Sequence, residues 1–146
     1  MPRVRPRAEV SRRMIEPKLP KQTAADERRA RAAVKERDQG MCVRCGGPGT
    51  NWDHRKNRSQ GGRWEASNGQ TLCGSGTTGC HGFVTQNPAA AVLEGFTVPS
   101  WARPELWPAW RHDVGWVLYF DAPADGHWWE PISQATADLL MNGGKR

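Results

Sequence analysis

The chain lacks long apolar runs and has no apolar stretch typical of a secretory signal near its basic N-terminus. Its longest apolar runs, such as PAAAVL and WVLYF, are far shorter than the ~20 residues that a membrane-spanning helix needs. Only 37% of the residues are hydrophobic and the mean hydropathy is −0.75, so the apolar core must be small. We therefore expect a cytoplasmic protein that does not associate with membranes.

Acidic residues are too few to balance the basic ones over the first 86 positions. Residues 1–40 carry twelve Lys and Arg against six Asp and Glu, and residues 41–86 carry five against two. Residues 87–146 reverse the sign, with four against seven. Positive charge on the N-terminal part suits a polyanion such as nucleic acid, although a solubilising basic tail would have the same composition.

Local patterns predict an arm followed by short elements. Four prolines and seven basic residues in residues 1–22 predict a disordered basic arm. Thr23, followed by Asp26 three residues later, predicts a helix from Ala24 to about Asp38 that Gly40 ends. The remaining predicted elements are a short helix in PAAAVLE, a hairpin of VGWVLYFD and HWWEPIS across APADG, and a helix over about 134–141. Six of the eight tryptophans lie in residues 101–129, which indicates either packing of this hairpin or a protein-docking surface.

All four cysteines fall in two pairs, a C-x2-C pair at Cys42 and Cys45 and a C-x6-C pair at Cys73 and Cys80. Disulfides are rare in the cytosol, whereas four thiolates suit a tetrahedral Zn²⁺. We predict a structural zinc on all four, with two alternatives: a site in which His81 replaces one cysteine, or four free thiols. Metal binding would supply folding free energy that the small core cannot.

Asp53, His54, Asn68 and His81 lie between or beside these cysteines. A phosphodiesterase needs a divalent metal and a base whose pKa lies near neutrality, and histidine suits the second task. Adjacent side chains on a strand point to opposite faces, so Asp53 can bind a metal while His54 faces a water molecule. On a helix, Cys80 and His81 would diverge by about 100° and could serve two different metal ions.

The ordered pattern C-x2-C, DH, GG, N, LC and CH resembles the HNH endonuclease family of the ββα-metal, or His-Me finger, superfamily over about residues 34–84. The resemblance implies a small α+β protein with a zinc-stabilised ββα-metal core, preceded by the basic arm and helix and followed by the Trp-rich hairpin extension. The chain would divide into the arm at 1–22, a nuclease module at 23–86 and the extension at 87–146.

The resemblance also implies roles for single residues. Asp53 and His81 would bind the catalytic ion, His54 would be the general base, and the amide of Asn68 would pin the loop between the strands and hold His54. The structural zinc would be held by Cys42, Cys45, Cys73 and Cys80. The catalytic ion would be Mg²⁺ or Mn²⁺, although an Asp and His ligand set also accepts Ni²⁺ or Zn²⁺. One departure from the family pattern is the inserted GSGTTG before Cys80.

The implied partner is DNA, hydrolysed to 5′-phosphate and 3′-hydroxyl ends by a monomer or weak dimer. Candidate phosphate contacts are basic residues of the loop beside the site, which could equally be solvated: Arg55, Lys56, Arg58 and Arg63. Compact HNH proteins of this type are common in bacteriophages, so terminase or portal proteins are candidate partners. The alternatives are a non-catalytic zinc module that binds nucleic acid and a protein that regulates a terminase nuclease.

Overall fold

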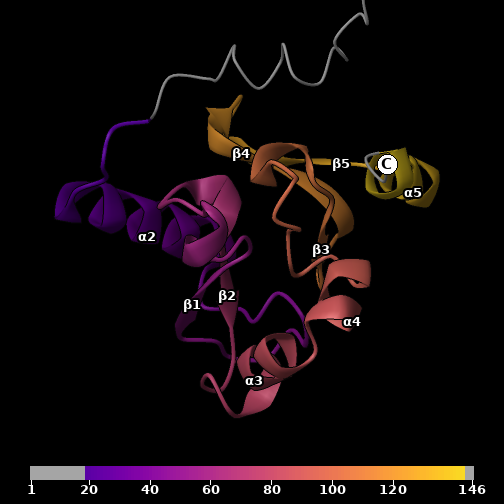
Figure 1. The fold of residues 1–146 in the computed structure, drawn as a ribbon, viewed down its shortest axis with the longest axis horizontal. Coiled ribbons are helices and arrows are strands. Elements are labelled where there is room, and N and C mark those ends of the chain that lie inside the picture. The colour runs from indigo at the N-terminus through magenta and orange to yellow at the C-terminus, as the bar shows by residue number, and fades with distance from the viewer. Residues whose placement is uncertain (1–18, 144–146) are drawn as a thin grey trace, which may run out of the picture.

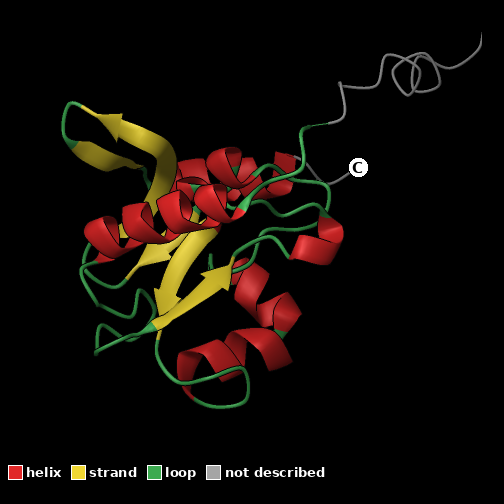
Figure 2. Cartoon of the chain, turned by 90° about the vertical axis from the view of Figure 1, so that its left-hand side faces the viewer, coloured by secondary structure: helices red, strands yellow, loops and turns green. Residues whose placement is uncertain are grey.

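The computed structural model describes residues 19–143, a small α+β fold with two antiparallel sheets and, within this range, four α-helices. The predicted basic arm lies largely outside the described residues. The chain runs through helix α2, the hairpin β1–β2, helices α3 and α4, the sheet β3–β4–β5 and helix α5 (Figure 1). The two sheets and their helices pack together, and the β4–β5 hairpin projects from one side (Figure 2).

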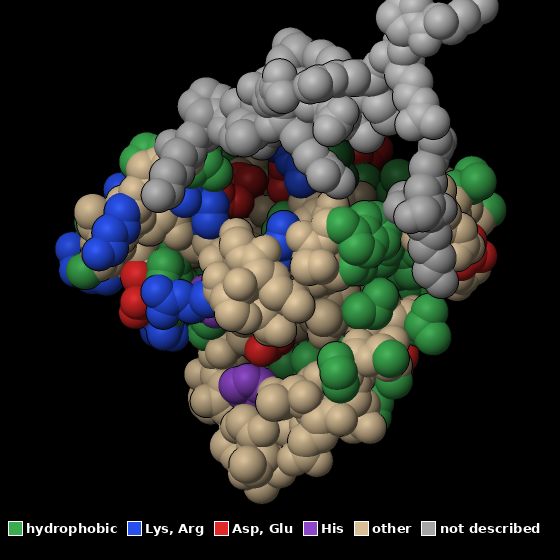
Figure 3. Space-filling model, in the orientation of Figure 1, with side chains coloured by type: hydrophobic (Ala, Val, Ile, Leu, Met, Phe, Trp, Pro, Cys, Tyr) green, Lys and Arg blue, Asp and Glu red, His purple; other side chains and the backbone are tan. Residues whose placement is uncertain are grey.

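Helix α2 spans Ala24–Asp38, as the sequence predicts. The backbone N–H of Thr23 donates to the carboxylate of Asp26 at 2.7 Å, and the backbone N–H of Asp26 donates back to the Thr23 hydroxyl at 3.4 Å. This capping box satisfies two backbone donors at the start of the helix. The helix ends at Gln39 in the left-handed conformation, one residue before the predicted Gly40. Lys and Arg side chains gather over α2 on one side of the molecule (Figure 3).

Strands β1 (Asn51–His54) and β2 (Gly69–Leu72) form a two-stranded antiparallel sheet in which Asp53 faces Gln70 and His54 faces Gly69. Helix α3 (Gly79–Gln86) follows β2 after a short turn, so the order is strand, strand, helix. The small core around them is a cluster of buried residues that includes two cysteines: Cys42, Val43, Leu72, Cys80, Val84, Ala91 and Phe96.

The C-terminal part matches the predicted order of elements. Its bounds are α4 at Pro88–Leu93, β4 at Gly115–Ala124, β5 at His127–Pro131 and α5 at Gln134–Gly143. The sequence missed β3 (Ala109–Arg111), which pairs with β4. Most of the tryptophans here are wholly or partly buried, and Trp107 and Trp129 pack in apolar clusters, whereas Trp101 is 53% exposed. Packing therefore accounts for most of this Trp-rich segment.

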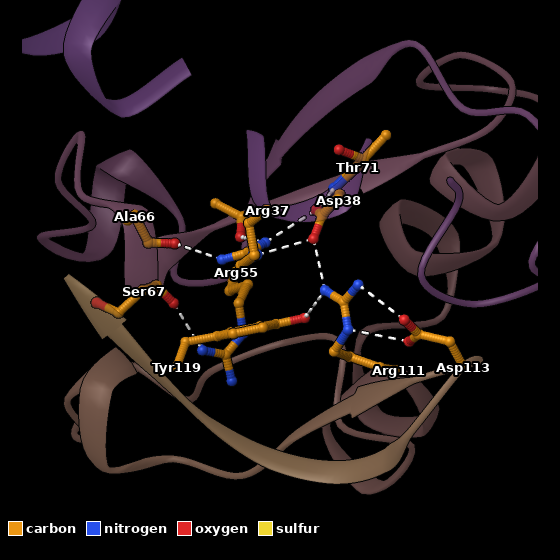
Figure 4. A network of polar contacts seen from close by, with 10 residues as sticks. Arg37, Asp38, Arg55, Ala66, Ser67, Thr71, Arg111, Asp113 and Tyr119 are labelled. Atoms are coloured by element: carbon orange, nitrogen blue, oxygen red, sulfur yellow. Dashed lines mark hydrogen bonds and ion pairs between the residues drawn. The ribbon is translucent and has the colours of Figure 1, made fainter. Parts of the chain in front are cut away.

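A buried ionic network joins the end of α2 to the second sheet (Figure 4). The carboxylate of Asp38 accepts hydrogen bonds from Arg37 at 2.8 and 2.9 Å, from Arg111, and from the backbone N–H of Thr71 at 3.1 Å. The guanidinium of Arg37 lies 3.7 Å from the ring centroid of Tyr119, a cation–π contact. These side chains are nearly inaccessible to solvent. The negative charge of the carboxylate and the positive charges of its arginines therefore neutralise each other in place of water.

Candidate functional site

The four cysteine sulfurs lie within 4.8 Å of one another. Four ligands at ~2.3 Å from a tetrahedral zinc ion are about 3.8 Å apart, and the sulfurs of Cys45 and Cys73 are separated by 3.8 Å. The cluster therefore fits one tetrahedral metal ion such as zinc, which confirms that the two predicted pairs meet. His81 stands outside this cluster of ligand atoms.

The first cysteine pair sits on a turn that glycine makes possible. The backbone N–H of Gly46 donates to the Cys42 carbonyl at 2.8 Å, and that of Gly47 donates to the Cys45 sulfur at 3.4 Å. Gly46 has φ +80°, and a Cβ there would lie 2.3 Å from the His112 ring. A side chain at position 46 would thus both strain the turn and collide with His112.

The second pair closes the site from the end of β2 and the first turn of α3. The inserted GSGTTG folds into a tight turn in which the Ser75 N–H donates to the Thr78 carbonyl at 3.0 Å, and α3 begins at Gly79. The backbone N–H of Cys80 donates to the Cys73 sulfur at 3.4 Å. This bond lowers the pKa of Cys73 to about 7, whereas burial raises the pKa of Cys80 to about 12.

Arg44 covers the cysteine cluster from one side. Its guanidinium donates to the Cys80 sulfur at 3.6 Å, pairs with Glu94 at 3.4 Å and stacks 3.8 Å from the Phe83 ring centroid. A metal ion held by four thiolates keeps a net negative charge, so a fixed cation at this position offsets part of it.

Asp53 and His81 meet between β1 and α3. The Asp53 Oδ1 and His81 Nε2 atoms are 3.4 Å apart, and the side chains are 14% and 20% exposed. Two ligands of one metal ion at ~2.1 Å lie about 3.0 Å apart in octahedral geometry and about 3.4 Å apart in tetrahedral geometry, and a direct ion pair has a similar distance. Gln70 donates to Asp53 Oδ2 at 2.8 Å and to the Phe96 carbonyl at 2.7 Å, which fixes the carboxylate. The hydrogen bond to Asp53 raises the pKa of His81.

His54 points to the opposite face of the hairpin, into a cage of two tryptophans. Its Nδ1 accepts a hydrogen bond from the Trp52 indole at 3.0 Å, and the ring of Trp64 stands edge-on at 4.4 Å between centroids. Nε2 is buried and has no hydrogen-bond partner among the described residues. Because an indole N–H can only donate, Nδ1 carries the lone pair and the neutral ring has its proton on Nε2. Burial lowers the pKa of His54, although the neighbouring Asp53 opposes the shift.

Asn68 ties together the loop that follows β1. Its Oδ1 accepts from the Lys56 N–H at 2.7 Å, and its Nδ2 donates to the carbonyls of Lys56 at 3.2 Å and Arg63 at 3.0 Å. The side chain is fully buried, so these bonds replace water that it cannot reach. The amide thus lies where it can fix both ends of the 56–63 loop.

Of the four residues predicted to contact DNA, Arg55 cannot do so, and that prediction is wrong. It is fully buried, and its guanidinium donates to four backbone carbonyls, those of Ser67, Pro104, Trp107 and Pro108, at 2.7 to 3.2 Å. Burial lowers its pKa to about 10. A side chain so enclosed holds the protein together and cannot reach a phosphate. Its position directly after the strand gave no sign of this, because three of the four acceptors lie about 50 residues later in the chain.

The other three basic residues reach the surface to different degrees. The Lys56 ammonium donates to the Ala102 carbonyl at 3.0 Å, and the Arg63 guanidinium donates to the Pro20 carbonyl at 3.2 Å. Arg58 is exposed and lies 5.7 Å from the Trp64 ring centroid. Arg58 is therefore the loop residue best placed to meet a ligand.

Sequence reasoning missed Gln70, Arg44 and the two tryptophans around His54. Gln70 could have been found, because strand alternation and an antiparallel register place it opposite Asp53. Trp64 and Arg44 reach their partners only through tertiary packing.

No described helix is long and apolar enough to cross a membrane. A scan against models of protein families, a search of curated proteins and a search of solved structures found no match to this chain.

Proposed function

We propose that the chain is a metal-dependent endonuclease of the HNH type that hydrolyses phosphodiester bonds of DNA. Water would attack the phosphorus, the bond from phosphorus to the 3′ oxygen would break, and 5′-phosphate and 3′-hydroxyl ends would result. The observation that carries the proposal is the meeting of Asp53 from β1 and His81 from α3 at 3.4 Å.

The order of elements supports the same reading. Strands β1 and β2 are followed by α3, as the ββα resemblance implies, and Cys80 in the first turn of α3 belongs to the cysteine cluster. A metal ion bound there would fix the start of the helix that carries His81. The structural ion would thereby set the position of a residue of the proposed catalytic site.

Asp53 and His81 would hold the catalytic ion, most simply Mg²⁺ or Mn²⁺, although this ligand pair also accepts Ni²⁺ or Zn²⁺. Such an ion supplies stabilisation of the charge that develops on the phosphate and on the leaving oxygen. Gln70 would keep the Asp53 carboxylate aimed at the ion, since it donates to the other carboxylate oxygen.

His54 would take the proton from the attacking water, and this role requires a movement. Its Nδ1 is occupied by the Trp52 N–H and its Nε2 is enclosed. The ring must therefore leave the Trp52 hydrogen bond and turn toward the phosphate before it can act as a base. The loop tied by Asn68 lies next to His54, and its fixed backbone would limit where the ring can turn.

The enclosure of His54 also favours the second candidate, a zinc module that binds nucleic acid without cutting it. In that case the Asp53 and His81 pair would be a structural ion pair and His54 a packing residue. A packaging role with a terminase or portal partner remains a proposal from the family resemblance alone.

The decisive experiment is cleavage of supercoiled plasmid by the zinc-loaded protein with added Mg²⁺ or Mn²⁺. One site per chain predicts nicked circles first. His81→Ala should abolish nicking or raise the required metal concentration, while His127→Ala, which changes an exposed histidine on β5, should nick as the wild type does. If the wild type binds plasmid and leaves it intact with every metal, the non-catalytic alternative is correct.

A further inference from the structure

A groove of about 590 Å³ lies between α2 and the hairpin, on the face to which Trp52 and His54 point. Its lining includes the cations Arg31 and Lys35, the aromatic ring of Trp52, and the polar side chains of Gln39, Asn51 and Thr71. Among all the described residues that line the groove there are two cations and no carboxylate. The volume is in the ~300–1,000 Å³ range of sites that hold a small organic group, and it suits one nucleotide better than a whole duplex.

The aromatic part of this face is organised around Arg31. Its guanidinium lies 4.9 Å from the Trp64 ring centroid and 5.9 Å from that of Trp52, and the two rings are 5.1 Å apart. Gly69 makes room for this arrangement, because a Cβ there would lie 2.0 Å from the Trp52 ring. Proteins bind single nucleic-acid strands on surfaces of this kind. The phosphates contact the cationic side chains, and the nucleobases stack on the aromatic rings.

Competition within the protein for these cations is weak. Arg31 pairs with Glu27 at 3.1 Å, but both side chains are about half exposed, and such pairs contribute only ~0–1 kcal/mol. Lys35 is exposed at the groove. A second hollow, beside Arg44, carries Glu94 in its lining, and the two are paired at 3.4 Å, so it has no comparable positive charge. The charge of the α2 groove therefore singles it out for a polyanion.

We propose that this groove binds a single nucleic-acid strand, with phosphates on Arg31 and Lys35 and an unstacked base against Trp52. The inference deepens the proposed function, since it names an unpaired or locally opened strand as the form that the protein grips. Trp52 lines the groove and also donates to His54. A nucleobase seated on the Trp52 indole would therefore touch the residue that holds His54, the proposed general base, in its enclosed position.

The test is anisotropy of labelled 12-residue oligonucleotides across a salt series, with zinc-loaded protein and no added catalytic metal. Arg31→Ala with Lys35→Ala removes two proposed phosphate contacts and should reduce the log–log salt slope for a single strand by about 1.4. The matched control is Arg28→Ala with Arg29→Ala, which removes the same charge from exposed positions of the same helix outside the groove. The control should leave the slope nearly unchanged.

Trp52 is tested by two substitutions, each checked for zinc content and thermal unfolding. Trp52→Ala should weaken strand binding about 5- to 150-fold, the usual effect of removing a stacking ring, whereas Trp52→Phe keeps a ring and should bind within about twofold. Single-stranded DNA and RNA of one sequence show which backbone is preferred, and either supports the groove. Equal loss in both double variants, or tighter binding of the duplex than of the strand, overturns it.

The outcome is separable from that of the nuclease proposal, because no cleavage is needed to measure binding. If the wild type nicks plasmid and the Arg31 and Lys35 variant binds strands normally, only the groove inference fails. If that variant loses strand binding and the wild type cuts nothing, only the nuclease proposal fails.

Discussion

Asp38→Asn is the substitution for which the structure gives the clearest energetic expectation. The carboxylate is inaccessible and accepts hydrogen bonds from Arg37, Arg111 and the Thr71 N–H. Asparagine keeps the shape and one acceptor oxygen but removes the charge that compensates two buried guanidinium groups. Breaking a buried ion pair from one side costs ~3–5 kcal/mol, and we expect about 3 kcal/mol because one acceptor remains.

The assay is urea unfolding at a fixed free zinc concentration, because a metal that binds only the folded state adds to apparent stability. With a denaturant slope of ~2 kcal/mol per molar, the midpoint should fall by about 1.5 M. The control is Asp113→Asn, which also removes a partner of Arg111 but from a carboxylate that is 40% exposed, and it should cost below ~1 kcal/mol. Equal losses for the two variants, or a loss below ~1 kcal/mol for Asp38→Asn, would refute the reasoning.

The stability difference between the wild type and Asp38→Asn should depend on pH with a definite sign. Burial alone would raise the pKa of Asp38, but the charges and hydrogen bonds of Arg37 and Arg111 outweigh it and lower the pKa in the folded protein. A carboxylate with a lowered folded pKa stabilises the protein above its unfolded pKa, about 3.9, and that contribution disappears as the pH falls through the folded value. The gap between wild type and Asp38→Asn should therefore be full at pH 7 and should shrink below about pH 4.

Three further predictions concern the metal and the candidate site. Purified protein should contain about one tightly bound zinc ion per chain. Cys42→Ser should lose the ion and unfold, because Cys42 is buried in the small core. A folded, fully active Cys42→Ser protein would contradict this prediction. If the chain nicks DNA, His54→Ala should slow nicking by ~10²–10⁴-fold without weakening the binding of the catalytic metal. Asp53→Ala should weaken that metal binding. Equal loss of metal binding in the two variants, measured by calorimetry, would refute this division of roles. Asn68→Ala removes three hydrogen bonds of a buried amide. It should lower the free energy of unfolding by about 2–3 kcal/mol, at about 1 kcal/mol per bond, and speed hydrogen exchange in residues 56–63. Unchanged exchange there would show that the loop does not depend on the amide.

Features coded by neighbouring residues could be predicted from the sequence. The capping box of α2 and the proline at the start of α4 were readable because each rests on residues within one helical turn. The meeting of Cys42 and Cys45 with the second cysteine pair followed from thiol chemistry rather than from local structure. The adjacency of Asp53 and His54 likewise gave their opposite directions on β1, since strand alternation alone decides it.

Features that depend on distant packing could not be predicted. Arg55 looked like a surface cation because three of its four acceptors stand about 50 residues later. The cage around His54 needs Trp64, and the loop that holds Trp64 beside the hairpin is bonded to the distant side chains of Gln22 and Asn68. Strand β3 is only three residues long and pairs with β4 alone, and such a segment is too short for alternation to indicate a strand.

The contacts of Arg55 have a consequence for the time at which the candidate site can form during synthesis. Arg55 follows the strand that carries Asp53 and His54, yet its guanidinium is satisfied by carbonyls up to 53 residues further along the chain. A ribosome adds ~5–20 residues per second, so the last of those acceptors is made roughly 3 to 10 s after Arg55. Until the segment from Pro104 to Pro108 has been made, this charged side chain has only the Ser67 carbonyl of its four acceptors, and the strand beside it lacks a stable place in the fold. The hairpin with the proposed catalytic residues would therefore be complete in sequence several seconds before it could settle, so any activity would begin only when most of the C-terminal part has been made.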